Sequence, residues 1–271
     1  CMSSSTFQPA RQPAGSAVTR NAHASSDYTL KLAEAQAALS QAAAHYAPDE
    51  SGKSTVVQAS SLGAEDVVIS HLINSLQLDI GIFVLETGRL HQETLDLLEQ
   101  FKASSRAPVT VYTPVQEAVV EFVAREGLDA MYKSVALRKE CCAIRKMEPL
   151  ARALKGKSAW ITGLRREQSG ARAEVPLVDT SEPRAKINPL ANWTWGDVWH
   201  YIRENRVAYN PLHDQFYPSI GCEPCTRAIS QGEDFRSGRW WWEDEAAKEC
   251  GLHVKAAPSA TVSPLSEKSS A

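Results

Sequence analysis

Two kinds of hydrophobic pattern alternate along residues 27–163. In the longer stretches, apolar residues recur about every 3.6 positions, which is typical of amphipathic helices. Between them lie short apolar runs rich in β-branched residues, which are typical of buried strands. The predicted helices are Asp27 to His45, the stretch after the loop 60–66 through Leu76, His91 to Lys102 and a helix from Gln116; the predicted strands are Ser54–Ala59, Ile80–Leu85, Val109–Thr113 and Ala159–Thr162.

Strands that alternate with helices predict an α/β fold, a Rossmann-like parallel sheet covered on both faces. Sheets of this kind bind ligands beyond the carboxyl ends of their strands. The loops 60–66, 86–89 and 163–172 all follow predicted strands, so we expect them to meet at one edge of the sheet. The tryptophans of 193–199 and most of those of 240–242 are expected to pack in the core rather than to form a stacking platform.

Composition predicts one main domain with irregular ends. The chain has 271 residues, of which 43% are hydrophobic, enough for one substantial core. Residues 1–27 are rich in Ser, Ala, Gln and Arg, and we expect a disordered leader there, with a transit peptide as the alternative. This leaves 28–254 as the folded domain and 255–271 as a disordered tail.

Charge and cysteine usage exclude several classes of protein. The net charge of −3 argues against a general nucleic-acid-binding protein, which would carry a basic excess. No run approaches the ~18 apolar residues of a membrane span. Six cysteines are too few for a disulfide scaffold of this length, and their clustering is typical of metal binding or catalysis in a reducing compartment. We therefore expect a cytoplasmic protein.

The loop 60–66 is a candidate anion site. Ser60, Ser61 and Gly63 stand between a strand and a helix, where hydroxyls, backbone N–H groups and the helix dipole attract an anion. The loop lacks the lysine of a Walker A motif, which disfavours ordinary nucleoside triphosphate hydrolysis. A capped strand-to-helix turn without a ligand is the alternative for this loop taken alone.

Cations gather near the same predicted loops and near the cysteines. In a slightly acidic chain, such a set indicates a small ligand with several negative charges. For any single one of these residues, solvated surface charge is an equally good interpretation. The set comprises Arg145, Lys146, Arg165, Arg166, Arg172, Arg236 and Arg239.

Four cysteines fall in two pairs, Cys141-Cys142 and Cys222–Cys225, enough to close one metal centre. The Cys-x-x-Cys spacing occurs in both zinc and iron–sulfur sites. Adjacent residues on a helix point about 100° apart, so both can reach one partner only if it is bulky or the chain bends. A [4Fe–4S] cluster is therefore favoured over zinc. Cys250 remains unpaired among charged neighbours, as expected of a free nucleophile rather than a buried apolar residue.

These residues together resemble the assimilatory adenylyl-sulfate (APS) reductases of the phosphoadenylyl/adenylyl-sulfate reductase family. The resemblance covers roughly residues 30–254 and implies an adenine nucleotide alpha hydrolase-like (PP-loop) single domain with a mobile C-terminal segment at about 236–254. It rests on Ser-Ser-Leu-Gly-Ala-Glu-Asp (60–66), Glu-Thr-Gly-Arg-Leu (86–90), Cys-Cys-Ala-Ile-Arg-Lys (141–146), Gly-Leu-Arg-Arg-Glu-Gln-Ser (163–169), Cys-Glu-Pro-Cys (222–225), Arg-Ser-Gly-Arg-Trp-Trp-Trp-Glu (236–243) and Glu-Cys-Gly-Leu-His (249–253).

The resemblance implies reduction of APS to sulfite and AMP by thioredoxin, in sulfate assimilation and cysteine biosynthesis. Cys250 would attack the sulfonyl sulfur to form an S-sulfocysteine, from which thioredoxin releases sulfite. A [4Fe–4S] cluster on Cys141, Cys142, Cys222 and Cys225 would act electrostatically and structurally, coupled to substrate by Lys146. The matching substrate-binding positions are Lys146, Arg172, Arg236 and Arg239 for phosphate and sulfate, Ser60, Ser61, Gly63 and Glu65 in the nucleotide loop, and Leu85 and Gly163 near the adenine and ribose.

Three features depart from the family pattern. Glu86-Thr87-Gly88 stands where Asp-Thr-Gly is frequent, and Arg138 stands where histidine is frequent, so we expect only an auxiliary charge from Arg138. No thioredoxin-like domain follows Cys250, so we expect thioredoxin, or a glutaredoxin-like reductant, to act in trans, as in a bacterial rather than a plastid enzyme.

Several alternatives stay open. The enzyme could reduce both APS and its 3′-phosphorylated form PAPS, since some cluster-bearing relatives accept both. An iron–sulfur ATP pyrophosphatase that thiolates tRNA is the next candidate, although 60–66 lacks its Ser-Gly-Gly-x-Asp-Ser loop. A non-enzymatic iron–sulfur redox sensor or zinc-stapled binding module would explain four cysteines but neither Cys250 nor the arginines. The oligomeric state is left open, because relatives form dimers and tetramers.

Overall fold

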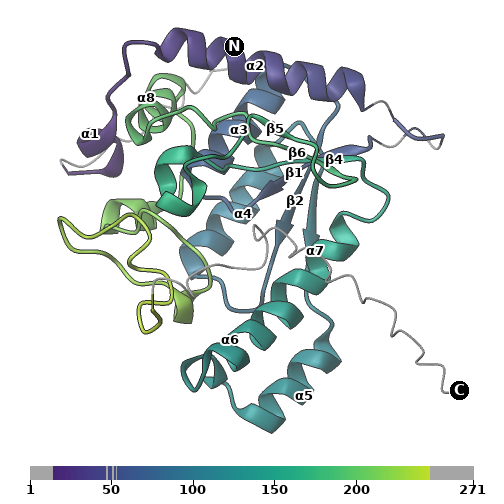
Figure 1. The fold of residues 1–271 in the computed structure, drawn as a ribbon, viewed down its shortest axis with the longest axis vertical. Coiled ribbons are helices and arrows are strands. Elements are labelled where there is room, and N and C mark those ends of the chain that lie inside the picture. Colours follow the sequence, from purple (N-terminus) through teal and green to yellow (C-terminus); the bar gives the residue numbers. More distant parts are fainter. Residues whose placement is uncertain (1–14, 47, 51, 53, 245–271) are drawn as a thin grey trace, which may run out of the picture.

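The computed structural model describes residues 15–46, 48–50, 52 and 54–244. A six-stranded sheet in the order β3-β2-β1-β4-β6-β5 forms its centre, and helices cover both faces (Figure 1). The strands are β1 Val56–Ser60, β2 Gly81–Leu85, β3 Val109–Tyr112, β4 Ala159–Ile161, β5 Val178–Asp179 and β6 Ala185–Ile187; the helices are α1 Ala17–Asn21, α2 Tyr28–His45, α3 Ala64–Ser75, α4 Gln92–Ser104, α5 Gln116–Glu126, α6 Val135–Cys142, α7 Glu148–Ala153 and α8 Trp195–Asn205.

The predicted parallel sheet is confirmed. All neighbouring strands pair in parallel except β5, which runs antiparallel to β6 at the edge. The chain passes from β1 outward to β2 and β3 and then returns to the other side of β1 with β4. The strand order therefore reverses between β1 and β4, and this switch point is where an open α/β sheet forms a crevice beyond its carboxyl edge.

Alternate residues of the strands pack into two separate clusters, as the period of two requires. Val56 of β1 belongs to the large cluster that the sheet forms with α2, α3, α4 and α8, whereas its neighbour Val57 belongs to the cluster on the α7 side. Ile161 and Trp160 of β4 divide in the same way. Because both faces of the sheet are covered here, β2 and β4 are apolar along their whole length and show no polar alternation.

Helix α8 carries the tryptophan-rich stretch, and the predicted core role of its indoles is confirmed. Trp193 is 1% exposed and Trp199 0%. Thr194 caps the helix, accepting from the Asp197 backbone, while the Asp197 carboxylate accepts from the backbone of Thr194. The 3₁₀ turn η5, Pro211–Gln215, follows and leads toward Cys222. Across the part of the chain that the structure describes, no helix has the length and apolar character needed to cross a bilayer.

The predicted leader boundary at residue 27 is wrong, because residues 15–27 pack against the domain. Ala17 and Val18 of α1 are buried in the main core. The backbone and hydroxyl of Ser25 donate to the Asp197 carboxylate at 2.7 and 3.0 Å. The segment contributes few apolar side chains, and its polar partners lie some 170 positions away along the chain, so composition alone could not indicate this docking.

Gly196 marks how closely this N-terminal segment approaches α8. A Cβ atom at Gly196 would lie 2.3 Å from the carbonyl oxygen of His23, so we expect Gly196→Ala to force the two segments apart. The free energy of unfolding should fall by about 1–3 kcal/mol, as for other overpacked sites. Urea denaturation measures this. Gly170→Ala, where a Cβ meets no atom within 4 Å, is the matched control, and equal stability of the two variants would contradict the close packing.

Candidate active site and cysteine cavity

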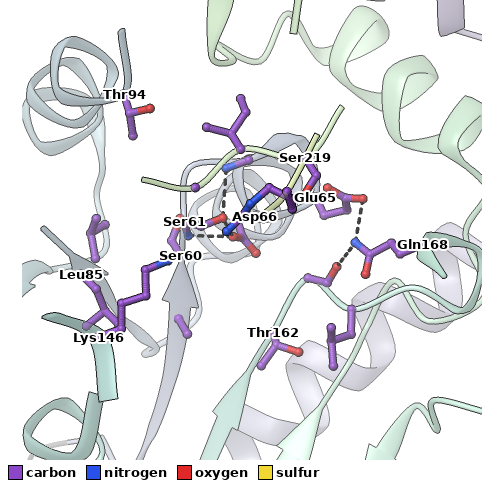
Figure 2. A pocket seen from close by; sticks show the side chains of 18 of the residues that line it. Ser60, Ser61, Glu65, Asp66, Leu85, Thr94, Lys146, Thr162, Gln168 and Ser219 are labelled. Carbon is purple, nitrogen blue, oxygen red and sulfur yellow. Dashed lines mark hydrogen bonds between the residues drawn. The ribbon is translucent and has the colours of Figure 1, made fainter. Parts of the chain in front are cut away.

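A cavity of about 210 Å³ opens at the carboxyl ends of β1, β2 and β4, at the switch point (Figure 2). Ser60, Leu85 and Thr162 line it at the ends of these three strands. The ten residues predicted to bind substrate, although far apart in the sequence, all line this cavity. They are Ser60, Ser61, Gly63, Glu65, Leu85, Lys146, Gly163, Arg172, Arg236 and Arg239. Cys250, the predicted nucleophile, lies outside the described residues.

The loop between β1 and α3 is held in shape by Asp66. Its Oδ2 accepts from the backbone N–H and the hydroxyl of Ser61, at 2.7 and 2.6 Å. Leu62 adopts the left-handed region with φ of 59°, and Ser60 Oγ accepts its N–H at 3.2 Å. Gly63 then begins α3 as its N-cap residue. The positive end of a twelve-residue helix therefore faces the cavity, which favours an anion there.

Burial raises the pKa of Asp66 to about 6, and the neighbouring Glu65 acts in the same direction, whereas the two bonds from Ser61 oppose the shift. Gly163, after β4, packs directly on this carboxylate. A Cβ atom at Gly163 would lie 2.5 Å from Asp66 Oδ1 and 2.9 Å from Glu65 Cβ. Only glycine allows the loop after β4 to approach the start of α3 so closely.

Four cations line the cavity, namely Lys146, Arg172, Arg236 and Arg239. Arg172 Nη1 donates to Gln168 Oε1 at 2.6 Å. Arg239 packs against Gly221, where a Cβ would lie 2.3 Å from its Nη2, and its buried Nε has no hydrogen-bond partner within the described chain. This concentration of positive charge suits a ligand with more than one negative group.

Arg165 and Arg166, which the sequence placed in the same cationic set, do not line the cavity. The Arg165 guanidinium is 1% exposed and donates to Glu65 Oε1 at 2.9 Å and to Glu167 Oε2 at 2.8 Å. Arg166 Nε donates to the Val175 carbonyl at 2.9 Å. The charge of Arg165 is thus neutralised within the fold, where it orients Glu65.

A second, smaller cavity brings the four paired cysteines together. Cys141, Cys142, Cys222 and Cys225 all line it, and all four are free thiols. Cys141 and Cys142 end α6, and a π-helical turn at Ala143–Met147 follows immediately. The π turn lies after both cysteines and carries Arg145 and Lys146. The Thr87 hydroxyl lies 3.2 Å from Cys222 Sγ.

The cysteine cavity is electropositive. Arg89, Arg138, Arg145 and Lys146 line it beside the sulfurs. Burial raises the pKa of the Cys141 thiol, and it raises that of Cys225 to about 12, so both sulfurs are neutral unless a metal takes the proton's place. Arg145 beside Cys141, and Arg239 and Lys146 beside Cys225, act in the opposite direction.

Lys146 belongs to both cavities. Figure 2 shows it in the larger cavity with Ser60 and Leu85. From its place in the π turn it also lines the smaller cavity with the cysteines. The two cavities therefore share a wall, and an anion bound in the larger one lies near the same positive charge as the sulfurs.

Sequence reasoning did not assign a role to His213, which lines the larger cavity from η5. Burial lowers its pKa to about 4, so the ring is neutral near pH 7. Its Nδ1 lies 2.7 Å from the Tyr217 carbonyl and therefore donates, while its Nε2 is buried with no hydrogen-bond partner among the described residues. The sequence signal that could have pointed to His213 is its position nine residues before Cys222.

Gln168 is a second cavity residue to which the sequence analysis gave no role, although it lies inside the motif 163–169. Its Nε2 donates to Glu65 Oε1 at 3.0 Å.

The fold and these cavities define a class: an α/β protein with an anion-binding cavity at the switch point of a parallel sheet, beside four clustered thiols. The phosphoadenosine phosphosulfate reductase domain model matches residues 55–228. Adenosine 5′-phosphosulfate reductase from Allochromatium vinosum is 54% identical over 201 residues, covering 73% of this chain and 78% of that protein. The Burkholderia cepacia protein of the same name is 55% identical over 198 residues, covering 72% and 79%.

Solved structures agree with this assignment. Phosphoadenylyl-sulfate (PAPS) reductase from Candida auris, in a phosphate complex, superposes with a TM-score of 0.58 at 27% identity, over 74% of this chain and 97% of that one. Yeast FAD synthetase shares the fold alone, with a TM-score of 0.51 at 9% identity, over 78% and 73%. This chain belongs to the phosphoadenosine phosphosulfate reductase family, and the predicted Rossmann-like, PP-loop α/β single domain is confirmed.

Replacing Asp66 should change the pH dependence of stability. Because the folded-state pKa is raised from 3.8 to about 6, the stabilising contribution is complete below pH 3.8 and is lost as the pH rises through 6. Asp66→Asn keeps an acceptor for Ser61 but does not ionise. The difference between the unfolding free energies of the wild type and of Asp66→Asn should therefore change by about 2–3 kcal/mol between pH 4 and pH 7, with the wild type losing stability.

Urea denaturation at the two pH values measures this difference. Asp96→Asn, on the exposed face of α4, is the matched control and should show little change with pH. A wild-type to Asp66→Asn difference that is flat between pH 4 and pH 7 would contradict the assigned pKa.

Proposed function

We propose that this chain reduces APS to sulfite and AMP in sulfate assimilation. The observation that carries the proposal is the shared wall at Lys146, which joins a cation-lined cavity at the sheet switch point to a cavity lined by four cysteines. Relatives 54% and 55% identical to this chain bear the name of that activity, and the ten matching side chains meet in one cavity.

The cavity offers a separate site for each part of the substrate. Leu85 and Gly163, at the ends of β2 and β4, would contact the adenine and ribose, since nucleosides lie along the carboxyl edge of such sheets. Ser60, Ser61 and Gly63 would bind the phosphate at the start of α3, with Glu65 bordering the loop. Lys146, Arg172, Arg236 and Arg239 would bind the phosphate and sulfate oxygens.

The chemistry requires three displacements at sulfur. In the first, the Cys250 thiolate attacks the sulfonyl sulfur, an S–S bond forms, and the S–O bond to AMP breaks with its electron pair leaving on the phosphate oxygen. In the second, a reductant thiolate attacks Cys250 Sγ and sulfite leaves with the S–S electron pair. The second thiol of the reductant then resolves the mixed disulfide and frees Cys250.

The cations overcome the main barrier of the first step, which is the approach of an anion to an anion. Lys146, Arg236 and Arg239 reduce the negative charge of the substrate before attack and stabilise the charge that collects on departing AMP. AMP phosphate disperses that charge, so the step needs no strong general acid. Arg172 is held by Gln168, which fixes one cation at the Gly163 side of the cavity.

We further propose that Cys141, Cys142, Cys222 and Cys225 hold a [4Fe–4S] cluster. Four thiols share one cavity whose other described lining residues include no His, Asp or Glu, and the surrounding cations suit a thiolate-bound centre of net negative charge. Cys141 and Cys142 are adjacent at the end of α6, where neighbouring side chains point about 100° apart, which favours a bulkier centre over zinc. Such a cluster would supply structure and local charge, while this chain's own residues perform the displacements.

The reductant in this proposal is a separate dithiol protein, thioredoxin or a glutaredoxin-like protein, in the reducing cytoplasm. Whether the chain accepts APS alone or also PAPS depends on the surroundings of the ribose 3′-hydroxyl. The likeness to a PAPS reductase at 27% identity makes dual use the second candidate. Thioredoxin-dependent sulfite release from APS and from PAPS, measured side by side, distinguishes the two, and release from neither would reject both.

Replacing the proposed nucleophile should abolish sulfite release while metal binding is kept. Anaerobically purified Cys250→Ser should keep the iron content and brown colour of the wild type but release no sulfite from APS, because a serine hydroxyl is a far poorer nucleophile than a thiolate. Sulfite assay and iron analysis on one preparation measure both. Sulfite release at the wild-type rate by Cys250→Ser would exclude this mechanism.

Cys142→Ser gives the complementary result. Loss of one of four thiolates should lower bound iron and acid-labile sulfide at least about tenfold, as expected when a ligand is removed. Colour and iron content report this directly, and circular dichroism checks that the sheet and helices persist. Cys250→Ser serves as the matched cysteine-to-serine control. Full iron in Cys142→Ser, or zinc in the wild type, would overturn the assignment of the cluster.

A further inference from the structure

A buried ion pair joins α6 to the last part of the described chain. Arg138 Nε and Nη2 donate to Glu243 Oε1 and Oε2 at 2.8 and 2.6 Å, a bidentate geometry. The two side chains are 1% and 2% exposed. A pair this buried and this directional fixes two segments in one relative position, because removal of either partner leaves the other charge unpaired. Arg138 is thus far more than the auxiliary charge expected from the sequence.

Arg138 also connects this ion pair to residues of both cavities. Its guanidinium hydrogen-bonds Cys142, and its Cζ lies 4.7 Å from the centre of the Trp240 ring. The Arg239 guanidinium lies at the same distance from that ring. Arg138 lines the cysteine cavity, whereas Arg239 and Trp240 line the larger one. These contacts connect the two cavities by a second route, separate from Lys146.

The backbone before Glu243 is tied to the second cysteine pair. Arg239 forms an isolated antiparallel bridge with Thr226, and Trp240 N–H donates to the Cys225 carbonyl at 3.2 Å. Glu243 N–H then closes a turn onto the Trp240 carbonyl at 2.9 Å. The Arg138–Glu243 pair follows these backbone ties and, within the described chain, is the side-chain contact nearest in sequence to Cys250.

The position of Glu243 limits where Cys250 can act. Cys250 follows Glu243 by seven positions, so its Cα can lie at most about 25 Å from that of Glu243. Fixing the start of so short a segment raises the effective concentration of the thiol near any point within that range. Glu243 lies beyond the residues that the family model matches, 55–228.

We propose that Arg138 and Glu243 are positioning residues, whose ion pair fixes the start of the Cys250 segment beside the cysteine and substrate cavities. The inference rests on the proposed function for the role of Cys250. Because Arg138 also contacts Cys142 and Trp240, the pair ties that segment to both cavities at once. The reacting atoms remain those of Cys250, the substrate and the reductant.

Glu243→Gln tests the proposal, since it removes the charge but keeps the size of the side chain and leaves Arg138 on Cys142 and Trp240. Trypsin cleavage after Lys248, followed by mass spectrometry, reports how firmly the segment is held. We expect the cleavage rate to rise about tenfold, as for a local opening that becomes easier. With APS, kcat should fall about tenfold while KM changes less than about threefold. Iron content should stay at the wild-type level.

Two variants make the result decisive. Glu243→Asp keeps the charge and should give an intermediate cleavage rate and kcat. Lys31→Met breaks another buried pair, with Asp197 at 3.3 Å, on the distant side formed by α2 and α8; it should lower the thermal midpoint without changing cleavage after Lys248. Equal cleavage rates in the wild type and Glu243→Gln, or an equal increase in Lys31→Met, would overturn the proposal.

The cleavage assay needs no substrate. If the wild type releases no sulfite from APS, the proposed function fails while the comparison of cleavage rates still decides whether the ion pair holds the segment. If sulfite is released but Glu243→Gln matches the wild type in both assays, the positioning role fails and the proposed function stands.

Discussion

The burial of clustered thiols is the constraint on which the rest of the site depends, since Cys141, Cys222 and Cys225 are buried and Cys142 is half-buried. Burial raises the pKa of Cys141 and Cys225, so the thiolates that any metal centre requires are costly unless positive charge lies beside them. Arg145 and Arg89 beside Cys141, and Arg239 and Lys146 beside Cys225, provide that charge. Since Lys146 also lines the larger cavity, the charge that stabilises the sulfurs also favours an anionic substrate next to them.

The same constraint explains the local backbone. Two adjacent ligands on a regular helix point about 100° apart, and the turn that follows Cys142 is π-helical. The wider turn carries Lys146 toward the sheet while Arg145 donates to the Thr87 carbonyl at 2.8 Å. Thr87 in turn contacts Cys222. Arg145 and Thr87 therefore link the turn after the first cysteine pair to Cys222 of the second pair.

Much of this could be predicted from the sequence. Apolar periodicity indicated four of the six strands and the parallel sheet, and the loops after β1, β2 and β4 meet at one cavity because these strands are parallel. Lys146, Arg236 and Arg239 reach the same cavity from other parts of the chain. The two- and three-residue strands β5 and β6 were missed because they are too short to show a period. Arg165 was misassigned since charge type alone does not tell whether an arginine meets a ligand or, as here, Glu65.

The docking of residues 15–27 shows why a family match understates the functional unit. Ala17 N–H donates to Asp214 Oδ1 at 2.7 Å, and Arg20 Nη2 donates to the His213 carbonyl at 2.9 Å while its guanidinium stacks on Phe216. These contacts hold the turn η5 and the residue after it. The His213 ring of the same turn lines the larger cavity. The chain then continues to Gly221, against which Arg239 packs. The docked segment, which lies outside residues 55–228, thus supports from behind the part of the cavity wall that leads to Arg239.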